Sequence, residues 1–123
     1  MTVLVVDDSS VMRMVIIKEL KKLGSIGDDI QEAADGAEAV KMAAENSYAL
    51  ILMDWNMPNM LGIDAVKAIR ASGNKTPIIM VTTEGERSNV VTAIQSGAND
   101  YLVKPFSLDD FRKKVSNLCS LPA

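Results

Sequence analysis

The chain has 123 residues, a net charge of −3 and 48% hydrophobic residues. This length fits one domain with a core of its own, and the hydrophobic content argues against disorder. The lack of a basic block argues against a nucleic-acid partner. The longest apolar run, YALILM, is too short to span a membrane. With one cysteine, Cys119, and no visible signal peptide, we expect a single domain in the cytoplasm, not associated with a membrane.

Histidine is absent from the chain. Its absence excludes catalytic triads with histidine, histidine metal sites and a histidine phosphoacceptor. The sequence also lacks GxxxxGK[ST] and GxGxxG, the two common glycine-rich loops that bind phosphate. Any phosphate chemistry must therefore depend on other residues.

Strand signals recur from the N-terminus to the C-terminus. In chain order, they are Val3–Val6, DIQEA near Ile30, Ala49–Met53, Pro77–Val81, and DYLVK near Leu102. The three segments given by their bounds are continuous apolar runs, which are typical of strands buried on both faces of a parallel sheet. The other two segments are more polar, so we expect them nearer the edges of the sheet.

A helix signal follows each strand signal. In chain order, the helices are marked by Val11, Val15 and Leu20 before Gly24, by a capping box of Asp35 and Glu38 before Val40 and Ala44, by Val66 and Ile69 before Gly73, by Val90 and Ile94 before Gly97, and by Ser107 as the cap of a stripe of Leu108, Phe111, Val115 and Leu118. Because crossovers between parallel strands are right-handed, this alternation predicts an α/β fold. We expect a doubly wound five-stranded parallel sheet with helices on both faces.

Polar residues stand where the predicted strands end. Asp7 and Asp8 follow the first strand, Asp54 follows the third, and Thr82 and Lys104 follow the fourth and fifth. The carboxyl ends of parallel strands share one edge, where such sheets bind ligands. Neighbouring carboxylates raise one another's pKa unless a cation joins them. Because the set offers oxygen ligands and no cysteine or histidine, it indicates a hard cation. Mg²⁺ is favoured over Ca²⁺, since two or three carboxylates leave room for waters and a phosphate.

Each of these residues also has a plainer explanation when it is taken alone. Asp7 or Asp8 could cap the following helix, although Ser9 and Ser10 lie nearer to its start. The threonine could cap its strand or loop, and the lysine could be solvated. The joint placement at one edge favours a functional site.

The segments VDDS, MDWNMPNMLG, VTTE and YLVKPF, in this order, resemble the response-regulator receiver domain. The resemblance covers nearly the whole chain. Trp55-Asn56, Glu84 and Tyr101 make it most similar to the stand-alone chemotaxis regulators of the CheY type. The resemblance implies a flavodoxin-like strand order of 2-1-3-4-5. It also implies a single receiver domain over residues 1–123, without an output domain.

The resemblance further implies a role for each residue at the predicted edge. Asp54 is the expected phosphoacceptor, and Lys104 and Thr82 are expected to contact the phosphoryl group. The implied Mg²⁺ ligands are Asp8, Asp54 and the backbone carbonyl of Asn56, with Asp7 acting through water. Phosphoryl transfer depends mostly on positioning and charge neutralisation, which this set can provide without histidine. The chain is then no enzyme beyond its own phosphorylation and autodephosphorylation.

Two further details accompany the resemblance. The Lys104–Pro105 peptide bond is expected to be cis, a form that only X–Pro bonds adopt at modest cost. Thr83 stands where many family members have a smaller residue, and a threonine there would narrow access to the phosphoryl group.

The partners implied by the resemblance are a sensor histidine kinase, a downstream protein such as a flagellar motor component, and a phosphatase. The chain itself is expected to be a monomer. The expected output surface consists of Tyr101, Val90, Val103 and Lys114. Its apolar and basic residues suit a short amphipathic, partly acidic partner segment.

The resemblance also implies a switch, in which a phosphoryl group would draw Thr82 inward and let Tyr101 move to a buried rotamer. The plainer alternative is that Tyr101 is a half-exposed aromatic on an edge strand with no role.

Three alternative functions stay open at this point. A single-domain phosphorelay intermediate would use the same acids. A Mg²⁺-dependent aspartyl phosphatase would need an acid two residues after its nucleophile, where this chain has Asn56. A flavodoxin-type carrier of FMN would need an uncharged phosphate loop after the first strand, where DDSS places negative charge.

Overall fold

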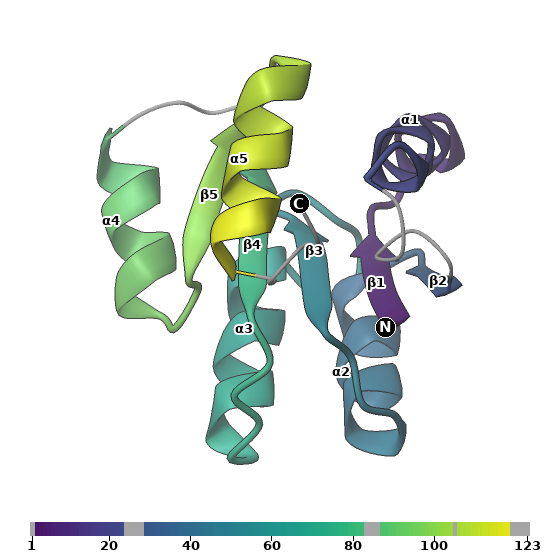
Figure 1. The fold of residues 1–123 in the computed structure, drawn as a ribbon. Coiled ribbons are helices and arrows are strands. Elements are labelled where there is room, and N and C mark those ends of the chain that lie inside the picture. The colour runs from purple at the N-terminus through teal and green to yellow at the C-terminus, as the bar shows by residue number, and fades with distance from the viewer. Residues whose placement is uncertain (1, 24–28, 83–86, 105, 119–123) are drawn as a thin grey trace.

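The computed structural model describes residues 2–23, 29–82, 87–104 and 106–118. Within these residues, strands and helices alternate along the chain (Figure 1). In chain order they are β1 Thr2–Val6, α1 Ser10–Lys21, β2 Asp29–Ala33, α2 Gly36–Glu45, β3 Leu50–Asp54, α3 Gly62–Ala71, β4 Ile78–Thr82, α4 Arg87–Gln95, β5 Asp100–Val103 and α5 Leu108–Leu118. This alternation confirms the α/β class that the sequence predicted.

The strands form one parallel sheet in the order β2-β1-β3-β4-β5. This order confirms 2-1-3-4-5 and places the two more polar strands, β2 and β5, at the edges. In the register of the sheet, Val6 of β1 lies beside Met53 of β3, and Asp54 lies beside Val81 of β4. The residues that follow β1 therefore lie beside the end of β3.

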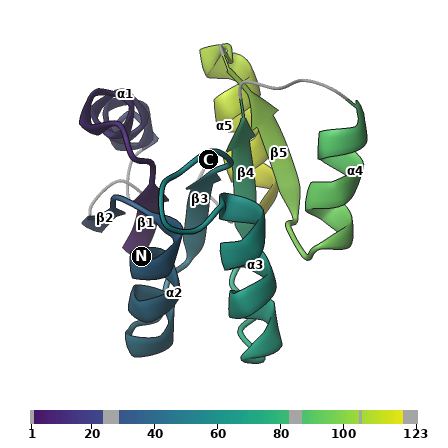
Figure 2. The same cartoon turned by 180° about the vertical axis from the view of Figure 1, so that it is seen from behind.

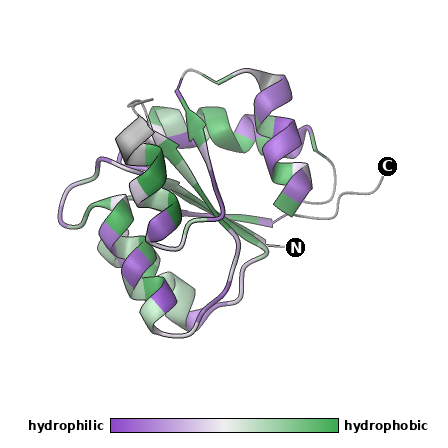
Figure 3. Ribbon diagram, turned by 90° about the vertical axis from the view of Figure 1, so that its left-hand side faces the viewer, coloured by the Kyte–Doolittle hydropathy of each residue, from purple (hydrophilic) through white to green (hydrophobic). Residues whose placement is uncertain are grey.

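The sheet has an apolar core on each of its faces. Successive side chains of a strand point to opposite faces, so Leu4 packs with residues of α2, α3 and α4, whereas Val5 packs with residues of α1 and α5. Figures 1 and 2 show α1 and α5 on one face, with α2 and α3 on the other. In Figure 3 the strands lie between the helices as a largely hydrophobic layer. The doubly wound arrangement is thus confirmed.

The helix faces differ in detail from the predicted stripes. In α1, Val11 is 69% exposed and Val15 is 44% exposed, and the buried residues are Ile16 and Leu20. Apolar residues occur almost all around this helix, so their periodicity did not identify the face that meets the sheet. The prediction for Val11 and Val15 was wrong.

Two other helices show a similar shift by one position. In α2 the buried residues are Gly36, Ala39 and Ala43, whereas Val40 is half-buried and Ala44 is exposed. In α4, Ala93 is buried and Ile94 is 45% exposed. Small alanines pack against the sheet in both helices, and the larger neighbours lie at the margin of the contact. In α3, by contrast, Val66 and Ile69 are buried as predicted.

The predicted caps are present at the described helix ends. Ser9 caps α1, since its hydroxyl accepts a hydrogen bond from the backbone N–H of Met12 at 3.2 Å. Asp35 caps α2 through the N–H of Glu38 at 2.8 Å, and Ser107 accepts from the N–H of Asp110 at 3.0 Å. Gly73 and Gly97 follow α3 and α4 with φ values of 87° and 115°, and such left-handed values favour glycine. Gly24 lies outside the described residues.

None of the helices in the described part of the chain has the length and apolar character that a membrane crossing requires.

Candidate functional site

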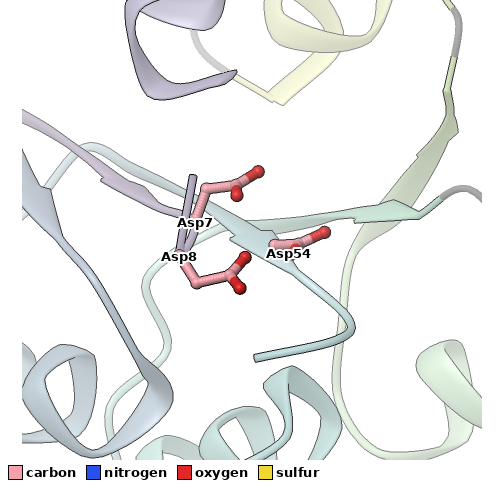
Figure 4. Close-up of side chains that lie close together, drawn as sticks. All are labelled: Asp7, Asp8 and Asp54. Atoms are coloured by element: carbon pink, nitrogen blue, oxygen red, sulfur yellow. The ribbon is translucent and has the colours of Figure 1, made fainter. Parts of the chain in front are cut away.

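Three carboxylates meet at the carboxyl edge of the sheet (Figure 4). Asp7 and Asp8 follow β1, and Asp54 is the last residue of β3. One oxygen from each carboxylate can be chosen so that the three lie within 4.8 Å of one another. Asp7 and Asp54 are 1% and 7% exposed, whereas Asp8 is exposed. The predicted convergence of the acids is therefore present in the fold.

A lysine that follows the edge strand β5 reaches two of these acids. Lys104 follows β5, and its ammonium nitrogen lies 3.1 Å from an oxygen of Asp7 and 3.1 Å from an oxygen of Asp54. Its backbone N–H donates to the carbonyl of Thr82 at 2.6 Å, which ties the end of β5 to the end of β4. The lysine is thus not the solvated side chain that was considered as its plainer explanation.

The other two predicted residues lie at the same edge. Thr82 is the last residue of β4, the neighbour of β3, and is 2% exposed. Asn56 is exposed in the loop that follows Asp54. Thr83, Glu84, Pro105 and Cys119 lie outside the described residues, so the predictions for Thr83 and for a cis Lys104–Pro105 bond stay predictions.

The buried acid Asp7 is fixed by its own surroundings. Its N–H donates to the carbonyl of Ala33 in β2 at 3.1 Å, and its carboxylate accepts from the N–H of Ser9 at 2.9 Å. Because Ser9 provides the cap of α1, neither Asp7 nor Asp8 is needed for that purpose. The simple capping explanation is therefore not supported.

The loop after Asp54 turns back beneath it at a position where only glycine fits. A Cβ atom on Gly62 would overlap the carbonyl oxygen of Asp54. The N–H of Gly62 donates to the carbonyl of Trp55 at 2.9 Å and closes the loop. Within the loop, Asn59 has a φ of 68°, and its side-chain amide donates to Asp35 at 2.9 Å. Asparagine tolerates this left-handed conformation better than most residues.

The site holds more negative charge than its lysine compensates. Burial raises the pKa of Asp54, and the charge of Asp7 raises it further against the opposing effect of Lys104. Burial alone would lower the pKa of Lys104, but its hydrogen bond to Asp7 and the charge of Asp54 raise it overall. A protonated lysine therefore faces three carboxylates. An additional cation bound beside the carboxylates would relieve this imbalance.

The residues of the predicted output surface lie around the edge strand β5. Val90, Tyr101, Val103 and Lys114 are all half-buried. The ammonium of Lys114 lies 4.1 Å from the centre of the Tyr101 ring and 2.8 Å from a carboxylate oxygen of Asp100. A hollow of about 350 Å³ is lined by Tyr101, Val103 and Lys114 together with Leu102, Phe106 and Asp110.

Two residues that contact the site were missed in the sequence. Arg13 of α1 donates to the backbone carbonyl of Asp7 at 2.5 Å, and Gly62 supports Asp54 as described above. An arginine one helical turn after a pair of acids is too common a pattern to indicate such a contact. The glycine was a usable signal, because glycine is the common residue where the backbone must pass close to another group.

Comparison with known proteins identifies the family. The model of the response regulator receiver domain matches residues 3–116. The chain belongs to this family. It is a receiver in two-component signalling, not a classical enzyme, and phosphorylation and Mg²⁺ dependence are general features of such domains.

The relatives include chemotaxis proteins. The chain is 45% identical to the chemotaxis protein CheY1 of Helicobacter pylori over 94% of each chain. It is also 45% identical to a chemotaxis protein CheY homolog of Campylobacter jejuni, over 96% of this chain and 92% of the homolog.

Solved structures with this fold include receivers from other bacteria. The receiver domain of the Francisella response regulator 1452 has a TM-score of 0.86 and 34% identity, covering 95% of this chain and 94% of that one. Vibrio cholerae chemotaxis protein CheY4 has a TM-score of 0.83 and 35% identity, covering 95% and 97%. The predicted resemblance is confirmed.

Proposed function

We propose that Asp54 is the phosphoacceptor of this receiver and that Lys104 and Thr82 contact the phosphoryl group. The observation that carries the proposal is the buried Asp54 carboxylate at the carboxyl edge of the sheet, with the Lys104 ammonium 3.1 Å away. The lysine can offset the repulsion between the carboxylate and an incoming phosphoryl group. Thr82, at the end of the adjacent strand, can donate a hydrogen bond to a phosphoryl oxygen.

The proposed donor is a phosphohistidine on a sensor histidine kinase. An oxygen of Asp54 attacks the phosphorus, the P–N bond breaks, and the imidazole leaves with the electron pair. The product is an acyl phosphate on Asp54. Attack by water on the same phosphorus then releases inorganic phosphate and restores the carboxylate, which is autodephosphorylation.

Mg²⁺ is the proposed cofactor, because the site offers oxygen ligands in a surplus of negative charge. Asp8 and Asp54 would hold the ion directly together with the backbone carbonyl of Asn56, and Asp7 would act through water. When bound, the ion supplies positive charge between the carboxylate and the phosphoryl group.

A magnesium titration of the full chain tests the metal site. Trp55 is the only tryptophan and adjoins Asp54, so its fluorescence should report binding. Mg²⁺ should also raise the melting temperature, because it binds the folded chain in preference to the unfolded one. Asp8→Asn should weaken both responses, whereas Asp109→Asn, an exposed acid in the first turn of α5, serves as the matched control. Equal binding by Asp8→Asn would refute the assignment.

We further propose that the module acts in chemotaxis, as a monomer in the cytoplasm. The identity to the chemotaxis proteins of Helicobacter pylori and Campylobacter jejuni supports this role. The proposed output is altered binding of a downstream protein, such as a flagellar motor component, at the surface of Tyr101, Val90, Val103 and Lys114, and a phosphatase would end the signal.

A transfer experiment separates chemotaxis from a phosphorelay. The phosphorylated chain is mixed with extract of its own cells, and the fate of the label is followed. A chemotaxis output should yield label on this chain and as free phosphate, with a partner retained on the phosphorylated chain but not on Asp54→Asn. Label that appears on a histidine of another protein would support the relay instead.

A further inference from the structure

Arg13 reaches from α1 back to the turn that carries two of the clustered acids. Its Nη1 donates to the backbone carbonyl of Asp7 at 2.5 Å, and its Nε donates to a carboxylate oxygen of Glu32 at 2.9 Å. The Arg13 side chain is 17% exposed. The guanidinium thus joins the start of α1 to the end of β1 and to the edge strand β2.

The carbonyl that Arg13 holds is important for the direction of Asp8. This carbonyl and the amide of Asp8 belong to one planar peptide unit. Fixing the carbonyl therefore fixes ψ of Asp7 and the position of the Asp8 Cα atom. The peptide unit on the other side of Asp8 is held by the hydrogen bond from the N–H of Ser9 to the Asp7 carboxylate. Together these two contacts set the direction in which the Asp8 side chain leaves the backbone.

Among the described contacts of Asp7 and Asp8, only the one with Arg13 fixes the orientation of the Asp7 carbonyl. The amide of Asp7 is bound by Ala33, and its carboxylate is bound by Ser9 and Lys104. Those contacts fix the position of Asp7, whereas its carbonyl is held by the hydrogen bond from Arg13. The Asp8 carboxylate is exposed and accepts no hydrogen bond from any residue that the structure describes.

We propose that Arg13 is a positioning residue of the metal site, which aims the Asp8 carboxylate at the point it shares with Asp7 and Asp54. Glu32 holds the guanidinium in place. The inference rests on the proposed function, since that function names Mg²⁺ as the ion. Mutation of a group that orients a metal ligand without touching the metal typically lowers the affinity for the metal by about 10- to 100-fold.

Charge and positioning have opposite effects at this residue. A guanidinium near the site repels a divalent cation, so the loss of its charge alone would strengthen Mg²⁺ binding. The loss of the hydrogen bond to Asp7 would release the peptide unit and weaken binding. The sign of the change in affinity therefore separates the two explanations.

The experiment measures the Mg²⁺ dissociation constant of the full chain by Trp55 fluorescence. Arg13→Gln should raise the constant about tenfold, in the range expected for groups behind a metal ligand. Arg13→Lys keeps the charge but lacks the fork of donors, so it should fall between the wild type and Arg13→Gln. Arg70→Gln is the matched control, because Arg70 also donates to backbone carbonyls, those of Gly97 and Asn74. It should lower the melting temperature and leave Mg²⁺ affinity unchanged.

A second measurement needs no metal. In ¹⁵N–¹H spectra of the metal-free chain, Arg13→Gln should shift or broaden the amide resonance of Asp8, and Arg70→Gln should leave it in place. Mg²⁺ binding by Arg13→Gln that is equal to or tighter than the wild type, or an unchanged Asp8 amide, would overturn the role of Arg13. Failure of the wild type to bind Mg²⁺ would overturn the proposed metal site as well. The wild type is titrated first, so this failure is distinguished from a failure of the role of Arg13.

Discussion

The ammonium of Lys104 lies 3.1 Å from a carboxylate oxygen of Asp54, although the two residues stand fifty positions apart in the chain. The same nitrogen also lies 3.1 Å from Asp7. One lysine thus serves two buried acids, while a third acid, Asp8, adds its charge nearby. This shared pairing leaves the site short of positive charge.

Replacing the lysine should destabilise the fold in a pH-dependent manner. Lys104→Met leaves Asp7 and Asp54 without their cation, so the free energy of unfolding should fall by about 2 kcal/mol at pH 7. Because the pKa of Lys104 is raised in the folded state, its contribution is present below its ordinary pKa of about 10.5 and is lost as the pH rises through the folded value. Denaturation by urea at pH 3, 7 and 11 measures this.

The difference between Lys104→Met and the wild type should shrink at pH 3, where the Asp54 carboxyl is protonated, and at pH 11, where Lys104 begins to lose its charge. Lys114→Met is the control, since its ion pair with Asp100 is more exposed and should be worth less than about 1 kcal/mol. Equal stability of Lys104→Met and the wild type at pH 7 would refute the account of the shared lysine.

Removal of the charge on Asp54 should stabilise the fold. The pKa of Asp54 is raised by burial and by Asp7, so the folded chain binds more protons than the unfolded chain as the pH rises above 3.8. Stability is therefore lost with rising pH through that window, and the ionised acid opposes folding at neutral pH. Asp54→Asn should raise the free energy of unfolding by about 1 kcal/mol and the melting temperature by about 3–5 °C at pH 7.

The gain from Asp54→Asn should vanish in acid, where the wild-type carboxyl is already neutral. Asp35 provides the contrast, because its hydrogen bond from the Glu38 backbone lowers its pKa. Asp35→Ala should therefore lower the melting temperature at neutral pH. A melting temperature of Asp54→Asn below that of the wild type would contradict the electrostatic description of the site.

Two glycine substitutions distinguish close approach from backbone strain. In Gly62→Ala the new methyl group would overlap the carbonyl of Asp54, so the backbone of the acid must shift. We expect a loss of at least about 2 kcal/mol together with weaker Mg²⁺ binding. In Gly73→Ala the space is open, and the φ of 87° alone should cost about 1 kcal/mol without any effect on Mg²⁺. Equal Mg²⁺ affinity of the two variants would show that Gly62 does not position Asp54.

Thr82→Ala and Tyr101→Ala should separate phosphorylation from output. Each variant should still accept a phosphoryl group on Asp54 but lose most of the gain in partner affinity. A switch of this kind needs a bias of only a few kcal/mol. Partner affinity is measured with and without the phosphoryl group, and Lys75→Ala, exposed at the opposite end of the sheet, serves as the control. If both variants respond like the wild type, the signal leaves the site by another route.

The sequence allowed the strand ends to be predicted more reliably than the helix faces. Asp7, Asp8 and Asp54 each follow a continuous apolar run, and the rule that parallel strands end at one edge brings them together. Strand order itself came from the family resemblance, because the apolar runs are too similar to rank. In α1, Ile16 lies directly beside Val15 in the chain, so no simple apolar period could show which of the two is buried.

Contacts between distant elements could not be predicted. The hydrogen bonds of Arg13 to Asp7 and Glu32, and the position of Lys114 over the Tyr101 ring, depend on how elements pack in three dimensions. No local pattern marks them. Lys114 was predicted as part of a partner surface, and its pairing with Asp100 means that a partner would have to compete for it.

The location of the phosphoryl group in the wild-type chain is the most direct test of the central claim. The chain is treated with acetyl phosphate and Mg²⁺, then with hydroxylamine, which converts an acyl phosphate to a hydroxamate, and its peptides are analysed by mass spectrometry. We predict one hydroxylamine-labile group on Asp54, absent from Asp54→Asn. A phosphoryl group on Ser9, Ser10 or Thr82 of the wild type, or one that resists hydroxylamine, would contradict the account.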